Sequence, residues 1–154
     1  MTATNPVAFV TGAAKRVGAA IARRLHTSGF DLVLHHRASP AEAGDLCAEL
    51  ESLRPGSTLI VRAELGDAAA LPALVAAAVA RFGRLDALVN NASAFHPTPI
   101  GKASAADWDA LFDSNAKGPF FLAQAAAPHL RAAGGAVVNL VDVYGERPLA
   151  QHTI

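Results

Sequence analysis

The sequence lacks the features on which several classes of protein depend. Its 154 residues contain one cysteine, Cys47, which cannot form a disulfide within the chain and which fits a reducing compartment. No run of about 18 apolar residues is present, so no membrane span is predicted. The N-terminus does not show the basic region and long apolar stretch of a signal peptide. These absences predict a cytoplasmic protein with no membrane partner.

Neither sign of charge is in excess. The 13 Lys and Arg residues balance the 13 Asp and Glu residues, so nothing favours a polyanionic partner such as nucleic acid. The six histidines are scattered, and none has a ligand spacing with Cys or a carboxylate. The sequence therefore predicts neither a nucleic-acid-binding protein nor a metal site.

Short apolar runs alternate with helical patterns along the whole chain. Strands are predicted at residues 7–11, 31–36, 57–63, 85–92 and 136–142, and helices at residues 16–29, 39–56, 67–83 and 104–134. Ser39 and Asp67 are the predicted N-caps of the second and third helices. Each helical crossover returns the chain to the same end of the sheet, so the strands are expected to be parallel. The pattern predicts one α/β domain over residues 1–154, a doubly wound parallel sheet in the order 3-2-1-4-5 that stops after its fifth strand.

A glycine-rich turn follows the first predicted strand, in the stretch VTGAAKRVGAAIA at residues 10–22. Gly12 lets the backbone turn sharply, and Gly18 lets the next helix pack close to the sheet. The N-terminus of that helix would offer free N–H groups to a pyrophosphate. A third glycine is usual between these two, and here Lys15 and Arg16 stand in its place. The turn is expected to meet the loop NNASAF, residues 90–95, where the strand order reverses.

The end of the second strand indicates which dinucleotide is bound. An Asp or Glu there normally binds a free ribose 2′-hydroxyl. This chain has instead HHR at residues 35–37, so Arg37 would join Lys15 and Arg16 around a 2′-phosphate through charge-assisted hydrogen bonds. The alternative is that Lys15 and Arg16 are solvated charges at a helix start, although positive charge there opposes the helix dipole. The residues favour NADP(H) over NAD(H) as the cofactor.

Four stretches in this order resemble the short-chain dehydrogenase/reductase family: TGAAKRVG, NNA, SNAKGPFFL and VVNLVD. The resemblance covers essentially the whole chain and implies a Rossmann fold. Within the family the chain is most similar to the pteridine reductases. The pointers are Arg16 in place of the middle glycine, the HHR segment, NNASAFHPTPI at residues 90–100, and Asp142 where most of the family has a catalytic serine.

The resemblance implies a set of cofactor-binding residues. The pyrophosphate and the adenosine phosphate would be held by Gly12, Lys15, Arg16, Val17 and Gly18, and His36 and Arg37 would face the 2′-phosphate. Glu64 and Leu65 match an Asp-Leu pair beside the adenine, with Glu in place of Asp. The remaining cofactor contacts would come from Asn90, Ala92 and Ser93. A structural alternative is that Asn90 and Asn91 only close a turn after the fourth strand.

The resemblance also implies residues that act on a substrate. Phe95 matches an aromatic side chain that stacks on a pterin ring, and Ser93 would reach the substrate as well as the cofactor. Asn115 matches an active-site Asn that holds a relay water or the catalytic lysine, and Asp142 would take part in proton delivery. Alternatively, Phe95 fills the core and Asp142 caps the next element. Tyr144 is expected near the substrate cleft as a loop residue, because the fourth residue after it is Pro148 rather than Lys.

The family's Tyr-x-x-x-Lys proton donor does not occur in these 154 residues. The chain is therefore interpreted as the N-terminal part of a longer short-chain reductase, inactive by itself, whose full-length form is a homo-oligomer, a tetramer. The expected activity is NADPH-dependent hydride transfer to a small pterin-like molecule such as a dihydropterin. The alternatives are an NADPH-dependent carbonyl or 3-oxoacyl-thioester reductase, and a non-catalytic NADP-binding fragment if the protein ends at residue 154.

Overall fold

The computed structural model describes residues 5–154, and its centre is a five-stranded sheet. The strand order is β3-β2-β1-β4-β5, and every pairing is parallel. The strands are β1 (Val7–Val10), β2 (Asp31–His36), β3 (Thr58–Arg62), β4 (Ala87–Asn90) and β5 (Ala136–Asn139). This arrangement confirms the predicted doubly wound Rossmann fold and its strand order.

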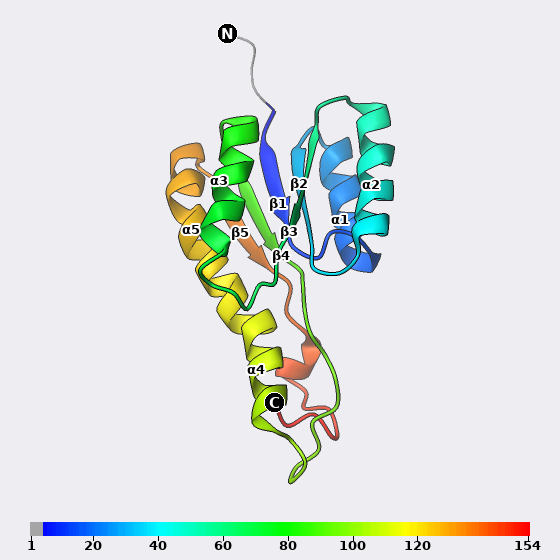
Figure 1. Ribbon diagram of the computed structural model, residues 1–154, viewed down its shortest axis with the longest axis vertical. Helices are drawn as coiled ribbons and strands as arrows, with labels where there is room; N and C mark the ends of the chain where they lie inside the picture. Colours follow the sequence, from blue (N-terminus) through cyan, green and yellow to red (C-terminus); the bar gives the residue numbers. More distant parts are fainter. Residues whose placement is uncertain (1–4) are drawn as a thin grey trace.

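Helices cover the sheet on both faces (Figure 1). The helices α1 (Arg16–Thr27) and α2 (Pro40–Leu53) lie on one face, and α3 (Leu71–Phe82) and α5 (Gly118–Ala133) lie on the other. β1 is at the centre, and all four of its residues are buried. Its side chains alternate between the two cores, with Val7 and Phe9 on the α3 and α5 side and Ala8 and Val10 on the α1 and α2 side. A buried parallel sheet of this kind explains why the strands read as continuous apolar runs.

The region predicted as one helix at residues 104–134 is divided into three parts. A short helix, α4 (Ala105–Phe112), is followed by a π-helical turn at Asp113–Lys117 and then by α5. Pro119 explains the break, because it has no N–H for the carbonyl four residues earlier and its ring crowds that turn. The wider π turn absorbs the mismatch and directs the chain into α5.

The third helix begins later than predicted. Its first residue is Leu71 and its N-cap is Ala70, whereas the sequence suggested a start at Asp67. Asp67 instead accepts a hydrogen bond from the Ala70 N–H through its main-chain carbonyl (3.0 Å), which forms a turn before the helix. Pro72 in the first helical turn is consistent with the later start, since its missing N–H is tolerated only there.

The fifth strand is the least protected part of the sheet. All four residues of β5 are exposed, in contrast to β1, and the strand ends at Asn139 rather than at residue 142. The following segment leads past a 3₁₀ turn (Val143–Gly145) to the region beside α4 (Figure 1). The exposed apolar side chains here include Val138, at 51%, and Val141, at 87%.

Substituting Leu122→Ala in α5 should destabilise the protein strongly. Leu122 is completely buried in the core between the sheet, α3 and α5, so its removal leaves a cavity. A loss of roughly 3–5 kcal/mol is expected. Leu53, also in a helix but 71% exposed, provides the control, and Leu53→Ala should change the free energy of unfolding by about 0.5 kcal/mol or less. Urea unfolding measures both, and equal losses would contradict this description of the core.

Candidate functional site

A hollow of about 430 Å³ opens at the carboxyl ends of the central strands. It is bounded by the loops that follow β1, β2, β3 and β4 and by the π turn. Its lining residues are Gly12, Lys15, Arg16, Val17, Gly18, His35, Arg37, Glu64, Leu65, Asn91, Ala92, Ser93 and Ser114. Ten of these thirteen residues belong to the set assigned from the sequence; His35, Asn91 and Ser114 are additions.

Two glycines let the turn after β1 fold tightly against itself. A Cβ atom on Gly18 would lie 2.1 Å from the Gly12 carbonyl oxygen and 2.6 Å from Nδ2 of Asn91. Gly12 has a φ of +62°, which L-amino acids with a side chain rarely adopt. The chain can therefore reverse direction here only because both Cβ atoms are absent.

Asn91 ties this turn to the loop after β4. Its Nδ2 donates to the carbonyl oxygens of Thr11 (2.9 Å) and Gly12 (3.2 Å). The Thr11 hydroxyl oxygen in turn accepts from the main-chain N–H groups of Asn91 (2.9 Å) and Ala92 (3.0 Å). The NNA motif pointed to this loop, but sequence reasoning assigned the binding role to the first asparagine rather than to the second.

Asn90 does not line the hollow. It is 5% exposed, and its Nδ2 donates to Oδ1 of Asn139 on β5 at 2.8 Å. Its own Oδ1 is buried without a hydrogen-bond partner among the described residues. In this structure the Asn90 side chain links the ends of β4 and β5.

The N-terminus of α1 faces the hollow without a compensating negative charge. Its N-cap residue, Lys15, makes no side-chain cap hydrogen bond, and the first turn contains no acidic residue. The helix therefore presents N–H groups and the positive end of its dipole to any anion in the hollow. Arg16 has a φ of +50°, in the left-handed region that favours glycine. This conformation explains why a glycine is usual at the position, and a bulky cation kept there in spite of it indicates a functional role.

Two of the three expected cations are paired with carboxylates. Nζ of Lys15 lies 2.6 Å from Oε1 of Glu42 on α2, and Nη1 of Arg37 lies 3.5 Å from Oε2 of Glu64. The hydrogen bond from Lys15 holds the pKa of Glu42 below its usual value. Arg16 has no ion pair within residues 5–154. Both pairs are solvent-exposed, so each adds little stability and the cations can exchange their partner.

The two histidines at the end of β2 lie on opposite faces of the sheet, because successive side chains of a strand alternate. His35 lines the hollow and is 2% exposed. Its Nδ1 accepts from the Gly12 N–H at 3.3 Å, and its Nε2 lies 3.2 Å from the Ala63 carbonyl oxygen. His36, which the sequence placed at the 2′-phosphate, is 5% exposed and is not part of the lining. Period-two alternation was the sequence signal that separates these two residues.

Apart from Ser93, the residues expected to act on a substrate lie outside this lining. Asn115, in the π turn, both accepts from the Ala94 N–H and donates to the Ala94 carbonyl, each at 2.8 Å. Phe95 is 58% exposed, so it does not fill the core, and its ring stacks on that of His152 with centroids 4.6 Å apart. Asp142 accepts from the Tyr144 N–H at 3.0 Å and caps the 3₁₀ turn.

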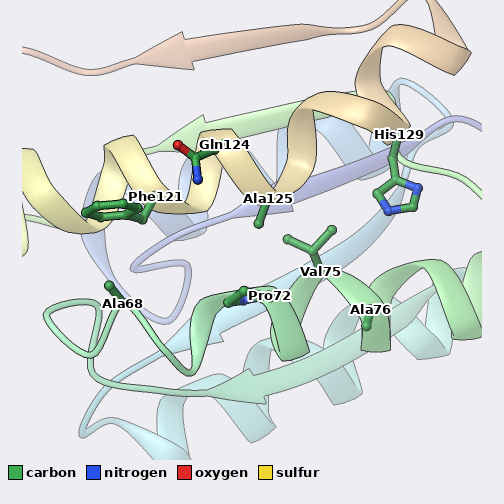
Figure 2. A pocket seen from close by; sticks show the side chains of 8 residues that line it. All are labelled: Ala68, Pro72, Val75, Ala76, Phe121, Gln124, Ala125 and His129. Carbon is green, nitrogen blue, oxygen red and sulfur yellow. The ribbon is translucent and has the colours of Figure 1, made fainter.

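A second hollow, of about 350 Å³, lies between α3 and α5 (Figure 2). Its walls are mainly apolar and include Val75 and Phe121, with Gln124 and His129 on the α5 side (Figure 2). None of the site residues assigned from the sequence lines it. Within residues 5–154 no cluster of three His, Cys, Asp or Glu side chains suits a metal ion, and no helix has the length and apolar character required to cross a bilayer.

Comparison with known proteins agrees with this geometry. A family model described as short chain dehydrogenase matches residues 6–154. The chain belongs to the short-chain dehydrogenase family. This result confirms the family resemblance recognised in the sequence motifs, and it explains why the glycine turn and the NNA loop meet at one hollow.

Three relatives show the range of activities to which the chain is similar. It is 38% identical to pteridine reductase 1 of Leishmania tarentolae, over 98% of this chain and 65% of the relative. It is 32% identical to a 3-oxoacyl-[acyl-carrier-protein] reductase of Staphylococcus aureus, over 90% of this chain and 56% of the relative. It is also 38% identical to D-threitol dehydrogenase of Mycolicibacterium smegmatis, over 95% and 56%. The chain thus spans between about half and two thirds of the length of these relatives.

The substitution Gly18→Ala should damage both the fold and the site. The added methyl group would collide with the Gly12 carbonyl, so a loss of roughly 2–4 kcal/mol is expected. Gly44, also inside a helix, has open space around its Cβ position, and Gly44→Ala should raise stability by about 0.5–1 kcal/mol. Thermal unfolding distinguishes the two variants. The close approach in the turn is refuted if Gly18→Ala is as stable as Gly44→Ala.

Stability should fall as the pH is lowered through the range in which histidine normally titrates. Burial lowers the pKa of His35 from its ordinary 6.5 to about 4, and burial also lowers the pKa of His26 and of His36. Below about pH 6.5 the unfolded chain binds protons that the folded chain does not, which favours unfolding. His35 alone should contribute a loss of roughly 3 kcal/mol between pH 6.5 and 4.

Urea unfolding at pH 7.5, 6.5 and 5.0 tests this prediction. The two higher values should agree, and the lowest should show a clear loss, in a range still above the usual titration of carboxylates. Stability that is constant down to pH 5.0 would contradict the burial of neutral histidines.

Proposed function

We propose that this chain forms the cofactor-binding part of an NADPH-dependent reductase, and that its hollow holds the adenosine and pyrophosphate of NADPH. One observation carries the proposal. The uncapped N-terminus of α1, the glycine turn and the three cations Lys15, Arg16 and Arg37 all meet at a single hollow of about 430 Å³. Each feature favours an anion, and together they suit a ligand with two separate phosphate positions.

The residues present fit such a ligand. The turn leaves no room for Cβ atoms on Gly12 and Gly18, so the main chain itself can approach a pyrophosphate closely. Arg16 needs no carboxylate to be displaced before it binds a phosphate, whereas Lys15 and Arg37 would exchange Glu42 and Glu64 for one. Leu65, Ala92 and Val17 provide apolar contacts along the rest of the hollow. When bound, NADPH supplies the hydride for reduction.

For the substrate we favour a pterin-like ring, such as a dihydropterin. The similarity to pteridine reductase 1 supports this choice, as does the exposed ring of Phe95, which offers a flat surface for stacking. Asn115 holds the backbone next to Phe95 by two hydrogen bonds and so positions that ring. We assign proton delivery to Asp142 and a contact with the substrate to Tyr144, which is 44% exposed.

A second candidate is an NADPH-dependent carbonyl or 3-oxoacyl-thioester reductase. It is favoured by the 32% identity to the 3-oxoacyl-[acyl-carrier-protein] reductase and by the stacking of Phe95 on His152, which covers one face of the ring. A homo-oligomer, a tetramer, is proposed for the whole protein, because exposed apolar side chains such as Phe120 and Val138 gather on α5 and β5. Location in the cytoplasm stays a prediction.

The preference for NADPH is tested at Arg37. Removing its charge with Arg37→Gln should weaken NADPH binding about tenfold to a hundredfold, because a charge-assisted hydrogen bond is lost, and should leave NADH binding unchanged. Arg23 is a matched control, since it is also an exposed arginine in an ion pair, with Glu49, but lies outside the hollow. Calorimetric titration measures both cofactors with both variants. The proposal fails if Arg37→Gln and Arg23→Gln bind NADPH equally well.

The choice between the two substrates is tested by parallel assays of the full-length protein with NADPH. A dihydropterin should be reduced with a kcat/KM well above that for an acetoacetyl thioester. Phe95→Ala should raise KM for the dihydropterin about tenfold or more, since stacking contributes roughly 1–1.5 kcal/mol. The opposite order of substrates, with Phe95→Ala unaffected, would support the second candidate.

A further inference from the structure

The partners of the His35 ring determine its protonation state. The Gly12 N–H can only donate, so Nδ1 must carry a lone pair, and the Ala63 carbonyl can only accept, so Nε2 must carry the proton. Burial lowers the pKa of His35 to about 4, and Glu64 and His36 are the titratable neighbours that act on it. His35 is therefore a neutral imidazole with a fixed tautomer.

His35 holds the phosphate turn at two successive residues. Its ring accepts from the Gly12 N–H, and its own main-chain carbonyl accepts from the Ala13 N–H at 2.8 Å. The ring is kept in place by burial and by Phe9, whose centroid is 6.4 Å away. The contact with Nδ1 falls on Gly12, the residue whose φ of +62° starts the reversal of the chain. Fixing these two N–H groups determines the direction in which the N–H groups at the start of α1 point.

We infer that His35 is a positioning residue for the cofactor, whose Nδ1 keeps the glycine turn in the conformation that binds the pyrophosphate. This inference rests on the proposed NADPH site and deepens it. His35 need not touch the phosphates, because it acts through Gly12. An acceptor at the position of Nδ1 is the feature required, and the bond to Ala63 serves to orient the ring.

Two substitutions separate the two hydrogen bonds. In His35→Asn the side-chain oxygen occupies the position of Nδ1 and can accept from Gly12, but the side chain is too short to reach Ala63. In His35→Gln the longer amide reaches Ala63, and no acceptor remains at the position of Nδ1. The full chain of each variant is titrated with NADPH. His35→Gln should bind about tenfold more weakly than the wild type, as expected for one lost hydrogen bond, and His35→Asn should recover most of that loss.

Measurements without cofactor show whether the turn itself responds. Amide hydrogen exchange at Gly12 should be slow in the wild type and in His35→Asn, and faster in His35→Gln. The ¹⁵N spectrum of the wild-type imidazole should show the proton on Nε2. The inference is overturned if Nδ1 carries the proton, or if His35→Gln leaves Gly12 exchange and NADPH affinity as in the wild type. If the wild type does not bind NADPH while Gly12 exchange follows the predicted order, the proposed function fails and the link between His35 and the turn stands.

Discussion

The site depends on the close approach of three main-chain segments at the first turn. The Gly12 carbonyl occupies the space that a side chain on residue 18 would need, and Asn91 bonds to the same carbonyl from the loop after β4. The turn therefore cannot widen without losing its hydrogen bonds to β4 and to His35. This closure holds the N-terminus of α1 at the carboxyl ends of the strands, where a free helix terminus attracts an anion. Fold and site share one constraint, since the residues that order the turn also shape the hollow.

Charge around the hollow is more balanced than the cations alone suggest. Lys15 and Arg37 are each paired with a carboxylate, and Arg16 adds the charge that has no such partner within residues 5–154. An additional phosphate on the ribose would compete with Glu42 and Glu64 for two exposed cations. Exposed pairs are weak, whereas a phosphate offers more acceptor oxygens and more charge, so the exchange is favourable. The preference for NADPH follows from this competition and not from positive charge by itself.

The sequence allowed the fold to be predicted because its signals are local. Alternating apolar runs and helical patterns predicted all five strands in the observed order, and Gly12 and Gly18 marked the turn correctly. Contacts between distant residues could not be predicted in this way. Asn91 meets Thr11 across 80 positions of the chain, and the choice between His35 and His36 depends on which face of β2 reaches the turn. The π turn was missed because the helical pattern continues across Pro119, and only the lost backbone hydrogen bond reveals the interruption.

The central claim is that the cations at the ends of β1 and β2 bind a phosphate on the 2′ position of the ribose. Calorimetric titration with adenosine 2′,5′-bisphosphate and with adenosine 5′-monophosphate tests it most directly, because the two ligands differ only in that group. The account predicts that the bisphosphate binds about tenfold more tightly or better at low ionic strength, and that the difference narrows as salt screens the exposed charges. Equal affinity for the two ligands at low salt would contradict it.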